Sequence, residues 1–374
     1  MKPTVRGIAE QFVLDGGLRE IVVYGNGLIN DTYLATTDSL REPRVIIQRI
    51  NRQVFPRPER VMANIEILID HVERQNRMLP SGERTLRLPK LYRAADGKSH
   101  VVDAEGDLWR ALSFIEQTRT LETIEDPNDA QEVGFALGRF HRLADALDTG
   151  RLHDTLPGFH VAPRYYQHYI QVSAKSDRTE TTALRACFQF MDARKHRIDV
   201  LEEAKRNGSL LLRPIHGDPK LNNILFDARS RRAVSIIDLD TVKSGLIHYD
   251  IGDCLRSCCN TAGESPESTW SVDFNLDLCR AILGGYVAEM RSILNARDYE
   301  YFYDAIHLIP FELGLRFLTD YLQGNRYFKV DDPEQNLRRA GTQFQLVASI
   351  ERQQLPIKKI IAELAGQYSV TYGR

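Results

Sequence analysis

The stretch HGDPKLNN, residues 216–223, decides the fold together with SIIDLD, residues 235–240. The first motif carries Asp218 and Asn223, and the second carries Asp238 at the end of an apolar run. Both motifs belong to one short β-rich island in a mostly helical part of the chain. We therefore expect a loop and the strand that follows it to bring these three polar side chains together.

These residue types suit the transfer of a phosphoryl group. Such a reaction needs a hydroxyl placed in line with a γ-phosphate, and groups that neutralise the developing charge. Asp218 is expected to accept the proton of the attacking hydroxyl, while Asn223 and Asp238 supply the hard oxygen ligands that Mg²⁺ prefers. Asp240 shares a strand face with Asp238 if the strand continues, and it is expected to bind a second metal ion or a substrate hydroxyl. Alone, HGD is common as a turn and Asn223 could cap a helix, but the joint spacing favours a metal site.

The N-terminal part of the chain reads as strands around one helix. Residues 20–36 form two β-like runs on either side of a glycine turn, and residues 44–50 form a third. Residues 57–76 carry apolar side chains at helical spacing. Residues 89–103 predict a hairpin, and residues 107–116 a last strand. This order favours an antiparallel sheet with one helix packed on it, rather than a doubly wound parallel sheet.

The rest of the chain is mostly helical. Helices are predicted over residues 129–147, 163–173 and 181–207, and again from about residue 273 to the end. The island at 213–242 interrupts them. The fold class is therefore α+β, with a small sheet lobe and a larger helical lobe.

The change of period marks the division between the two lobes. We expect an N-terminal nucleotide-binding lobe over residues 1–112, a hinge over residues 113–118, and a catalytic and substrate-binding lobe over residues 119–374.

Composition excludes several classes of protein. Lys and Arg number 49 against 51 Asp and Glu, so nothing calls for nucleic acid or an anionic membrane as partner. The N-terminus lacks the apolar core of a signal peptide, and no segment has the length of a membrane helix. The five Cys contain no C-x-x-C pair, which indicates reduced thiols and a cytoplasmic protein. Nothing in the sequence specifies an oligomeric state.

The two motifs, with SIIDLDTVKSGLIHYDIGD at residues 235–253, resemble the aminoglycoside phosphotransferase and choline kinase superfamily, which shares the protein-kinase fold. This resemblance implies that Asp218 is the catalytic base and that Asn223 and Asp238 hold magnesium. It also implies that His216 braces the catalytic loop and that Asp250 is a structural acidic residue.

Further segments, among them GNGLINDTYLAT, WRALSFIE and ELGLRFLTDYLQGNRYF, are similar to the N-acetylhexosamine 1-kinases. That resemblance spans about residues 20–330 and implies ATP-dependent phosphorylation of the anomeric hydroxyl of an N-acetylhexosamine or a similar sugar. Two alternatives stay open. One is a kinase of the same superfamily that acts on choline, homoserine or an aminoglycoside, and the other is a nucleotide-binding pseudokinase.

The donor side is expected to be built from the first strands. Gly25, Asn26 and Gly27 form either a plain hairpin turn or, as the downstream site favours, a cover over the ATP phosphates. A protein kinase carries Lys on the third strand, where this chain has Gln48 followed by Arg49. Either the contact with the phosphates is made by a neutral side chain, or Arg49 reaches them from the opposite face of the strand, or a bulge reorients the strand.

The hinge residues Phe114, Ile115 and Glu116 are expected to offer backbone groups to adenine.

The acceptor side rests on five residues. Asn30 and Asp31 could reach the sugar or the phosphates, although solvation at a strand edge would explain them equally well. Glu312, Arg316 and Asp320 repeat at four-residue spacing, which by itself predicts a ladder of helical ion pairs. The resemblance instead favours a contact between Arg316 and the sugar. Thr241 and Tyr327 are further candidates for lining the pocket.

Overall fold

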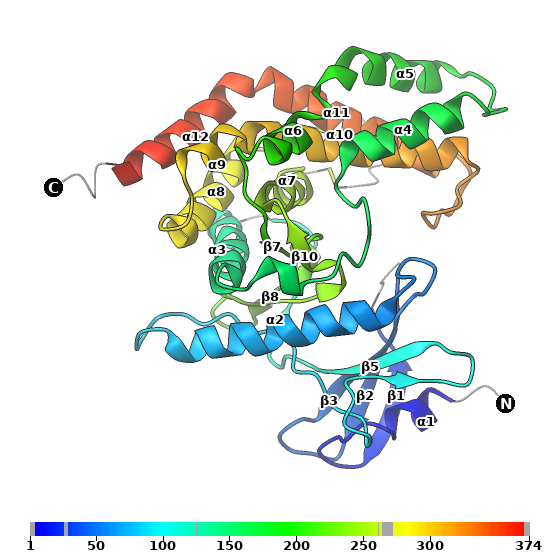
Figure 1. Ribbon diagram of the computed structural model, residues 1–374, viewed down its shortest axis with the longest axis vertical. Helices are drawn as coiled ribbons and strands as arrows, with labels where there is room; N and C mark the ends of the chain where they lie inside the picture. Colours follow the sequence, from blue (N-terminus) through cyan, green and yellow to red (C-terminus); the bar gives the residue numbers. More distant parts are fainter. Residues whose placement is uncertain (1–3, 26–28, 125, 261, 264–271, 370–374) are drawn as a thin grey trace.

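The computed structural model describes residues 4–25, 29–124, 126–260, 262–263 and 272–369. Figure 1 shows two parts, a sheet with the N-terminus at the bottom and a larger helical part above it. This confirms the α+β, two-lobed fold class.

The strands of the smaller lobe are β1 (Leu18–Val23), β2 (Asp31–Thr37), β3 (Arg44–Arg49), β4 (Val101–Val102) and β5 (Leu108–Ser113). The strands of the island and its neighbour are β6 (Thr118–Arg119), β7 (Arg213–Ile215), β8 (Ile224–Asp227), β9 (Ala233–Ile236) and β10 (Lys243–Gly245).

The α-helices are α1 (Val5–Ala9), α2 (Pro58–Met78), α3 (Pro127–Ala144), α4 (Ala162–Ser173), α5 (Thr182–Arg194), α6 (Val200–Arg206), α7 (Ile247–Cys258), α8 (Leu276–Met290), α9 (Ala296–Glu300), α10 (Phe302–Leu322), α11 (Gln335–Arg352) and α12 (Gln354–Ser369). Short 3-10 turns are η1 (Thr149–Arg151), η2 (Lys195–Arg197), η3 (Leu221–Asn223) and η4 (Leu239–Thr241).

The small lobe is an antiparallel sheet with the strand order β1-β2-β3-β5-β4. Alternation along β3 buries Val45 and Ile47, which pack with Ala111 of β5 and Ile8 of α1 in one apolar cluster. Gln48 lies directly opposite Arg110 in the β3–β5 pairing. Those two polar residues therefore share one face of the sheet.

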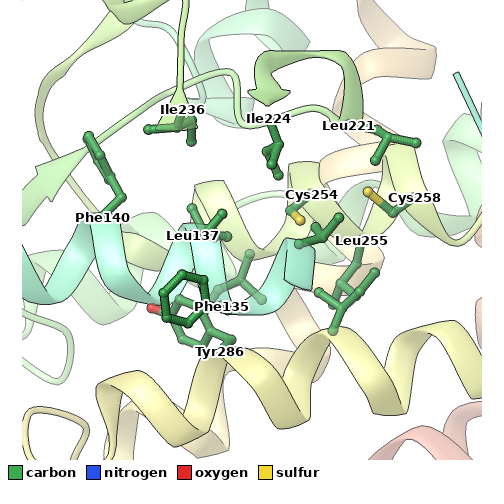
Figure 2. Packing of buried hydrophobic residues seen from close by; sticks show 14 of the residues in the cluster. Phe135, Leu137, Phe140, Leu221, Ile224, Ile236, Cys254, Leu255, Cys258 and Tyr286 are labelled. Atoms are coloured by element: carbon green, nitrogen blue, oxygen red, sulfur yellow. The ribbon is translucent and has the colours of Figure 1, made fainter. Parts of the chain in front are cut away.

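The island forms two small sheets that carry the motif residues. β8 pairs with β9 and β6, while β7 pairs with β10. Leu221, Ile224 and Ile236 are buried against α3 and α7, and Figure 2 shows their side chains pointing toward those helices. The apolar side of the island is thus anchored in the core, which leaves its loops to carry the polar residues.

Helix α2 is joined to the large lobe as well as to the sheet. Its buried side chains, among them Val61 and Leu68, belong to the same apolar cluster as α3, β8 and β9. The Asn64 amide donates to the carbonyls of Val242 and His153, at 2.8 Å each. In Figure 1 the helix accordingly lies between the sheet and the helical part.

Three sequence predictions differ from the structure. The helix expected over 181–207 is interrupted by η2, where Arg194 and Arg197 pair with Glu351 and Asp304 of neighbouring helices. Helix α7 was not predicted, although Ile247, Ile251, Cys254 and Leu255 recur at helical spacing; its polar residues are buried together with the apolar ones. The predicted hairpin at 89–103 has its turn, since Ala94 accepts from Gly97 and donates to Lys98, but only a short strand beside it.

Within the described residues, no helix is long and apolar enough to cross a membrane.

Candidate active site

The loop that carries Asp218 is held from behind by His216. The imidazole Nδ1 accepts a hydrogen bond from the backbone N–H of Asp218 at 3.3 Å, and Nε2 lies 2.9 Å from the carbonyl oxygen of Ile237. These partners require a neutral ring with its proton on Nε2, and burial lowers the pKa of His216. One side chain therefore ties the Asp218 loop to the residue before Asp238.

Asp250 supports the same loop from α7. Its carboxylate accepts the backbone N–H groups of His216 and Gly217, at 2.7 and 2.8 Å, and lies 2.8 Å from Nε2 of His141. Burial acts to raise the pKa of Asp250, but the contacts with His141 and His216 hold it below its usual value. The structure places both His216 and Asp250 behind the loop, where both are fully buried.

Gly217 is required by the close approach of two loops. Its φ is +88°, and a Cβ there would lie 2.8 Å from the carbonyl oxygen of Thr241. The Thr241 hydroxyl donates to the carbonyl of His216 at 2.7 Å. Thr241 thus joins the two motif loops, and its hydroxyl proton is already engaged.

Asp218 and Asn223 are joined by a direct hydrogen bond. The Asn223 amide donates to the backbone oxygen of Asp218 at 2.8 Å, which leaves the amide oxygen of Asn223 available. Lys220 Nζ lies 2.9 Å from Asp218 Oδ2. The carboxylates of Asp218 and Asp238 raise the pKa of Lys220 above its ordinary value, so this amine stays charged. A fixed cation therefore stands between the carboxylates of Asp218 and Asp238.

Asp238 follows β9 in a left-handed conformation, with φ 64° and ψ 60°, and it is exposed. Surrounding protein atoms, and then the neighbouring Asp240 carboxylate, raise the pKa of Asp238 to about 6. The backbone N–H of Ile237 donates to the carbonyl oxygen of Asn223 at 2.9 Å, which sets Asp238 beside Asn223. One carboxylate and one amide oxygen fit Mg²⁺, which takes few protein ligands and completes its shell with phosphates and water.

Asp240 is turned toward the small lobe. One carboxylate oxygen pairs with Arg110 of β5, and the other accepts from the Asn30 amide at 2.6 Å. The backbone carbonyl of Asp240 also accepts from the hydroxyl of Thr155 at 3.1 Å. The side chains of Asp240 and Asn30 thus join the large lobe directly to the small lobe.

The third strand separates Gln48 from Arg49. Gln48 shares a sheet face with Arg110, and its amide oxygen accepts two hydrogen bonds from Arg110, at 3.0 and 2.8 Å. Arg49 points to the opposite face, where it pairs with Asp31 and Asp107. Neither an Arg49 that reaches round nor a bulge occurs in β3, and the structure does not bring Arg49 or Asp31 to the motif loops.

Phe114, Ile115 and Glu116 connect β5 to β6. The Arg44 guanidinium lies 4.1 Å from the Phe114 ring centre and pairs with the Glu116 carboxylate. The backbone N–H groups of Ile115 and Glu116 have no hydrogen-bond partner in the described part of the chain. They are free to face a purine.

The glycine turn between β1 and β2 is described only at its start. Gly25 has a φ of 73° and open space around it, while Asn26 and Gly27 lie outside the described residues.

The predicted ladder of Glu312, Arg316 and Asp320 is wrong. Glu312 lies 3.2 Å from Nδ1 of His160, and Asp320 caps the backbone N–H groups of residues 326–328. Arg316 instead sits among aromatic rings. The Glu312 and Asp320 carboxylates therefore make contacts that their spacing along the helix does not predict.

Four rings surround the Arg316 guanidinium, with centres 5.1 to 5.8 Å from its carbon: Phe159, Tyr165, Tyr327 and Phe328. Arg316 has no hydrogen-bond or ion-pair partner among the described residues. Burial opposes its charge, but Tyr165, Tyr327, Glu312 and Asp218 raise its pKa above the ordinary arginine value. Next to Phe159, the Nε2 of His160 lies 2.8 Å from the carbonyl oxygen of Gly217. These four aromatic rings, the aromatic cage of Arg316, therefore lie next to the loop that carries Asp218.

Sequence reasoning missed two cations, Arg110 and Lys220. Arg110 stands in an apolar strand, LWRALS, and is 1% exposed. A charged residue within a buried strand is itself a signal of a specific partner. Lys220 lies inside the first motif, where attention to the acidic and amide residues left it unassigned.

The chain matches the phosphotransferase enzyme family over residues 20–281, more than half of its length. An aminoglycoside phosphotransferase from Alicyclobacillus acidocaldarius subsp. acidocaldarius has a similar structure, with 15% identity, a TM-score of 0.61, and coverage of 97% of this chain and 95% of that one. A microcompartment-associated aminopropanol kinase gives 17% identity and a TM-score of 0.59, with coverage of 94% and 96%. The GDP and kanamycin complex of APH(2″)-IIia gives 12% identity and 0.55, with coverage of 96% and 95%.

At these identities the structural likeness shows the fold, and the match over residues 20–281 shows the family. The superfamily that the two motifs indicated is thereby confirmed. The chain belongs to the phosphotransferase enzyme family and is a small-molecule phosphotransferase.

Proposed function

We propose that this protein transfers the γ-phosphoryl group of ATP to the anomeric hydroxyl of an N-acetylhexosamine or a closely similar sugar. The observation that carries the proposal is Arg316, a caged cation without a partner among the described residues, beside the loop of Asp218. A fixed positive charge suits a neutral acceptor with carbonyl or hydroxyl oxygens. It disfavours choline, amino alcohols and aminoglycosides, which bring positive charge of their own.

The donor would bind between the lobes. Residues 1–112 form the proposed nucleotide-binding lobe, 113–118 the hinge, and 119–374 the catalytic and substrate-binding lobe. The free N–H groups of Ile115 and Glu116 would face the adenine. Gly25, with Asn26 and Gly27, would cover the phosphates.

The catalytic groups act on the acceptor and on the phosphoryl group. Asp218 would orient the sugar O1–H and take its proton as the O1–P bond forms and the bond from phosphorus to the ADP oxygen breaks. Lys220 would offset the charge on the transferring group. Asn223 and Asp238 would hold Mg²⁺, which neutralises phosphate charge when bound. The acceptor would lie against Arg316 and Tyr327.

The test is a panel assay of ADP release with N-acetylhexosamines, neutral hexoses, amino alcohols and an aminoglycoside. We expect turnover on the N-acetylhexosamines and little on the cationic acceptors. Because phosphorylation of O1 removes the reducing end of the sugar, loss of reducing equivalents should match ADP released. Faster turnover of amino alcohols than of N-acetylhexosamines would overturn the proposal. So would a sugar product that keeps its reducing end.

Asp218→Asn tests the assignment of the base. It keeps the size of the side chain and its backbone contacts but cannot accept the proton. Turnover should be abolished while the melting temperature and ADP binding change little. Near-normal turnover would remove Asp218 from the mechanism. ADP binding by the native protein without turnover on any acceptor would instead indicate a pseudokinase.

The five Cys are all free and buried. This supports a cytoplasmic enzyme, since it needs no oxidising compartment.

A further inference from the structure

Arg110 occupies the place in the small lobe from which a strand-borne cation would face the motif loops. Gln48 stands at the position where a protein kinase carries lysine, and Arg110 is its direct partner on the neighbouring strand. Side chains at directly opposed positions leave the sheet on the same face, about 5 Å apart. The positive charge that a protein kinase carries on the third strand, β3, is thus found here on the neighbouring strand, β5.

A chain of contacts holds this guanidinium in one orientation. Its Nε and Nη2 both donate to the amide oxygen of Gln48, and the Gln48 amide donates in turn to the Thr32 hydroxyl at 3.0 Å. Its Nη1 pairs with Asp240. Gln48 therefore serves as the support that aims Arg110 at the large lobe.

The Arg110–Asp240 pair is almost completely buried, with 1% and 3% of each residue exposed. Asn30 completes the shell of Asp240, and the Asn30 side-chain oxygen accepts the backbone N–H of Asn51 at 3.0 Å. Glu66, in the middle of α2, pairs with Arg93 at 3.0 Å and not with the third strand. Arg110 thus makes a side-chain ion pair that links the sheet to the Asp238 turn.

We propose that Arg110 is a positioning residue of the phosphotransfer reaction, which pairs with Asp240 of the large lobe and fixes the turn that carries Asp238 against the small lobe. Asp240 is then the partner of Arg110, and Asp238 alone supplies the carboxylate to the metal. A guanidinium in contact with Asp240 would also repel a second divalent cation there. This inference rests on the proposed phosphoryl transfer and specifies how the site is aligned.

The experiment measures the affinity for Mg²⁺·ADP by calorimetry, and kcat and KM for ATP, in five variants. Arg110→Met should weaken Mg²⁺·ADP binding and lower kcat/KM by about 100-fold, because misplacement of reacting groups by about 1 Å has that effect. Asp240→Asn keeps one oxygen for Arg110, but it loses the acceptor of the Asn30 amide and leaves the buried guanidinium without a counter-charge. It should therefore lower kcat/KM and Mg²⁺·ADP affinity in parallel with Arg110→Met. Arg93→Met, which removes an arginine from an exposed ion pair of the same lobe, should leave both constants unchanged.

Rescue separates positioning from simple folding. Arg110→Lys keeps the charge but cannot hold Gln48 and Asp240 together, and it should fall between the native protein and Arg110→Met. Gln48→Lys added to Arg110→Met returns a cation to the same face from the other strand. It should recover at least about tenfold of the lost kcat/KM, which a general loss of packing would not allow.

Two results would overturn the proposal. One is an Arg110→Met protein that is folded at the assay temperature and binds Mg²⁺·ADP as the native protein does. The other is an Asp240→Asn protein whose affinity for Mg²⁺·ADP falls by more than about 100-fold while that of Arg110→Met does not fall. That result is expected if Asp240 is a direct metal ligand. The measurement of Mg²⁺·ADP affinity needs no acceptor. It therefore tests the role of Arg110 even if the proposed sugar is wrong.

Discussion

Replacing Arg316 by methionine tests the proposed acceptor site at the residue on which the proposal rests. The guanidinium carbon lies 5.1 Å from the ring centre of Tyr165 and 5.3 Å from that of Phe159. Methionine fills much of the same space and keeps the apolar contact with these rings, but it removes the charge and every donor. The structure therefore predicts a loss at the acceptor with little change in the surrounding packing.

The expected size follows from the bond that is lost. A hydrogen bond from a charged donor contributes about 1.5–3 kcal/mol, which corresponds to roughly 10- to 150-fold in kcat/KM for the sugar. The stacked rings contribute less to the stability of the fold. Loss of the cation–π contacts should lower the free energy of unfolding by about 1–2 kcal/mol.

The assay compares kcat/KM for the sugar and the affinity for Mg²⁺·ADP in the native protein and in Arg316→Met. Only the first should change, and cationic acceptors should gain relative to neutral ones. Arg194→Met is the matched control, because Arg194 also stacks on a ring, that of Phe190 at 3.6 Å, between α5 and α11. It should cost stability without changing the acceptor constants. A sugar kcat/KM in Arg316→Met within about twofold of the native value would refute the reasoning.

Gly217→Ala should lower the free energy of unfolding in urea by about 2–5 kcal/mol, from left-handed strain and a close contact with Thr241. Gly208→Ala is its control, since Gly208 has a φ of +77° and nothing within 4 Å of the added carbon. It should show the strain of about 1–2 kcal/mol alone, and equal losses would contradict the contact. The pKa of Asp238, raised to about 6, predicts that Mg²⁺-dependent ADP binding falls as pH drops through 6. Since this folded-state pKa lies above the unfolded one, Asp238 by itself makes the fold less stable as pH rises from about 4 to 6. ADP binding that is constant from pH 7 to 5 would contradict the first statement, and an equal pH dependence of the free energy of unfolding in the native protein and Asp238→Asn would contradict the second.

The two motifs could be found in the sequence because their residues are close along the chain and their types suit one reaction. Asp218 and Asn223 belong to a single loop. That loop leads into β8, and Asp238 follows β9, the strand that pairs with β8. The alternation of β3 could be predicted too, and it correctly put Gln48 and Arg49 on opposite faces. Period and spacing carry this information without any knowledge of distant contacts.

The rest depends on partners far apart in sequence. Arg110 and Asp240 are 130 residues apart, and no local pattern announces that pair. The i, i+4 spacing of Glu312, Arg316 and Asp320 suggested mutual ion pairs, whereas each side chain found a stronger tertiary contact. Helix α7 is different, because its apolar residues Ile247, Ile251, Cys254 and Leu255 do recur at helical spacing, so the sequence itself carried the signal for this helix.

The position of α2 has a consequence for control of the enzyme. Six of its side chains, Val61, Met62, Ile65, Leu68, Ile69 and Val72, are buried in the cluster that also contains α3, β8 and β9. Exposing even half of these on an outward swing would cost on the order of 5–9 kcal/mol, at about 1.5–3 kcal/mol for each side chain. Protein kinases are switched on and off by moving the corresponding helix. In this protein such a swing would compete with the stability of the whole fold, so its output should follow the supply of its substrates rather than an on–off transition of that helix.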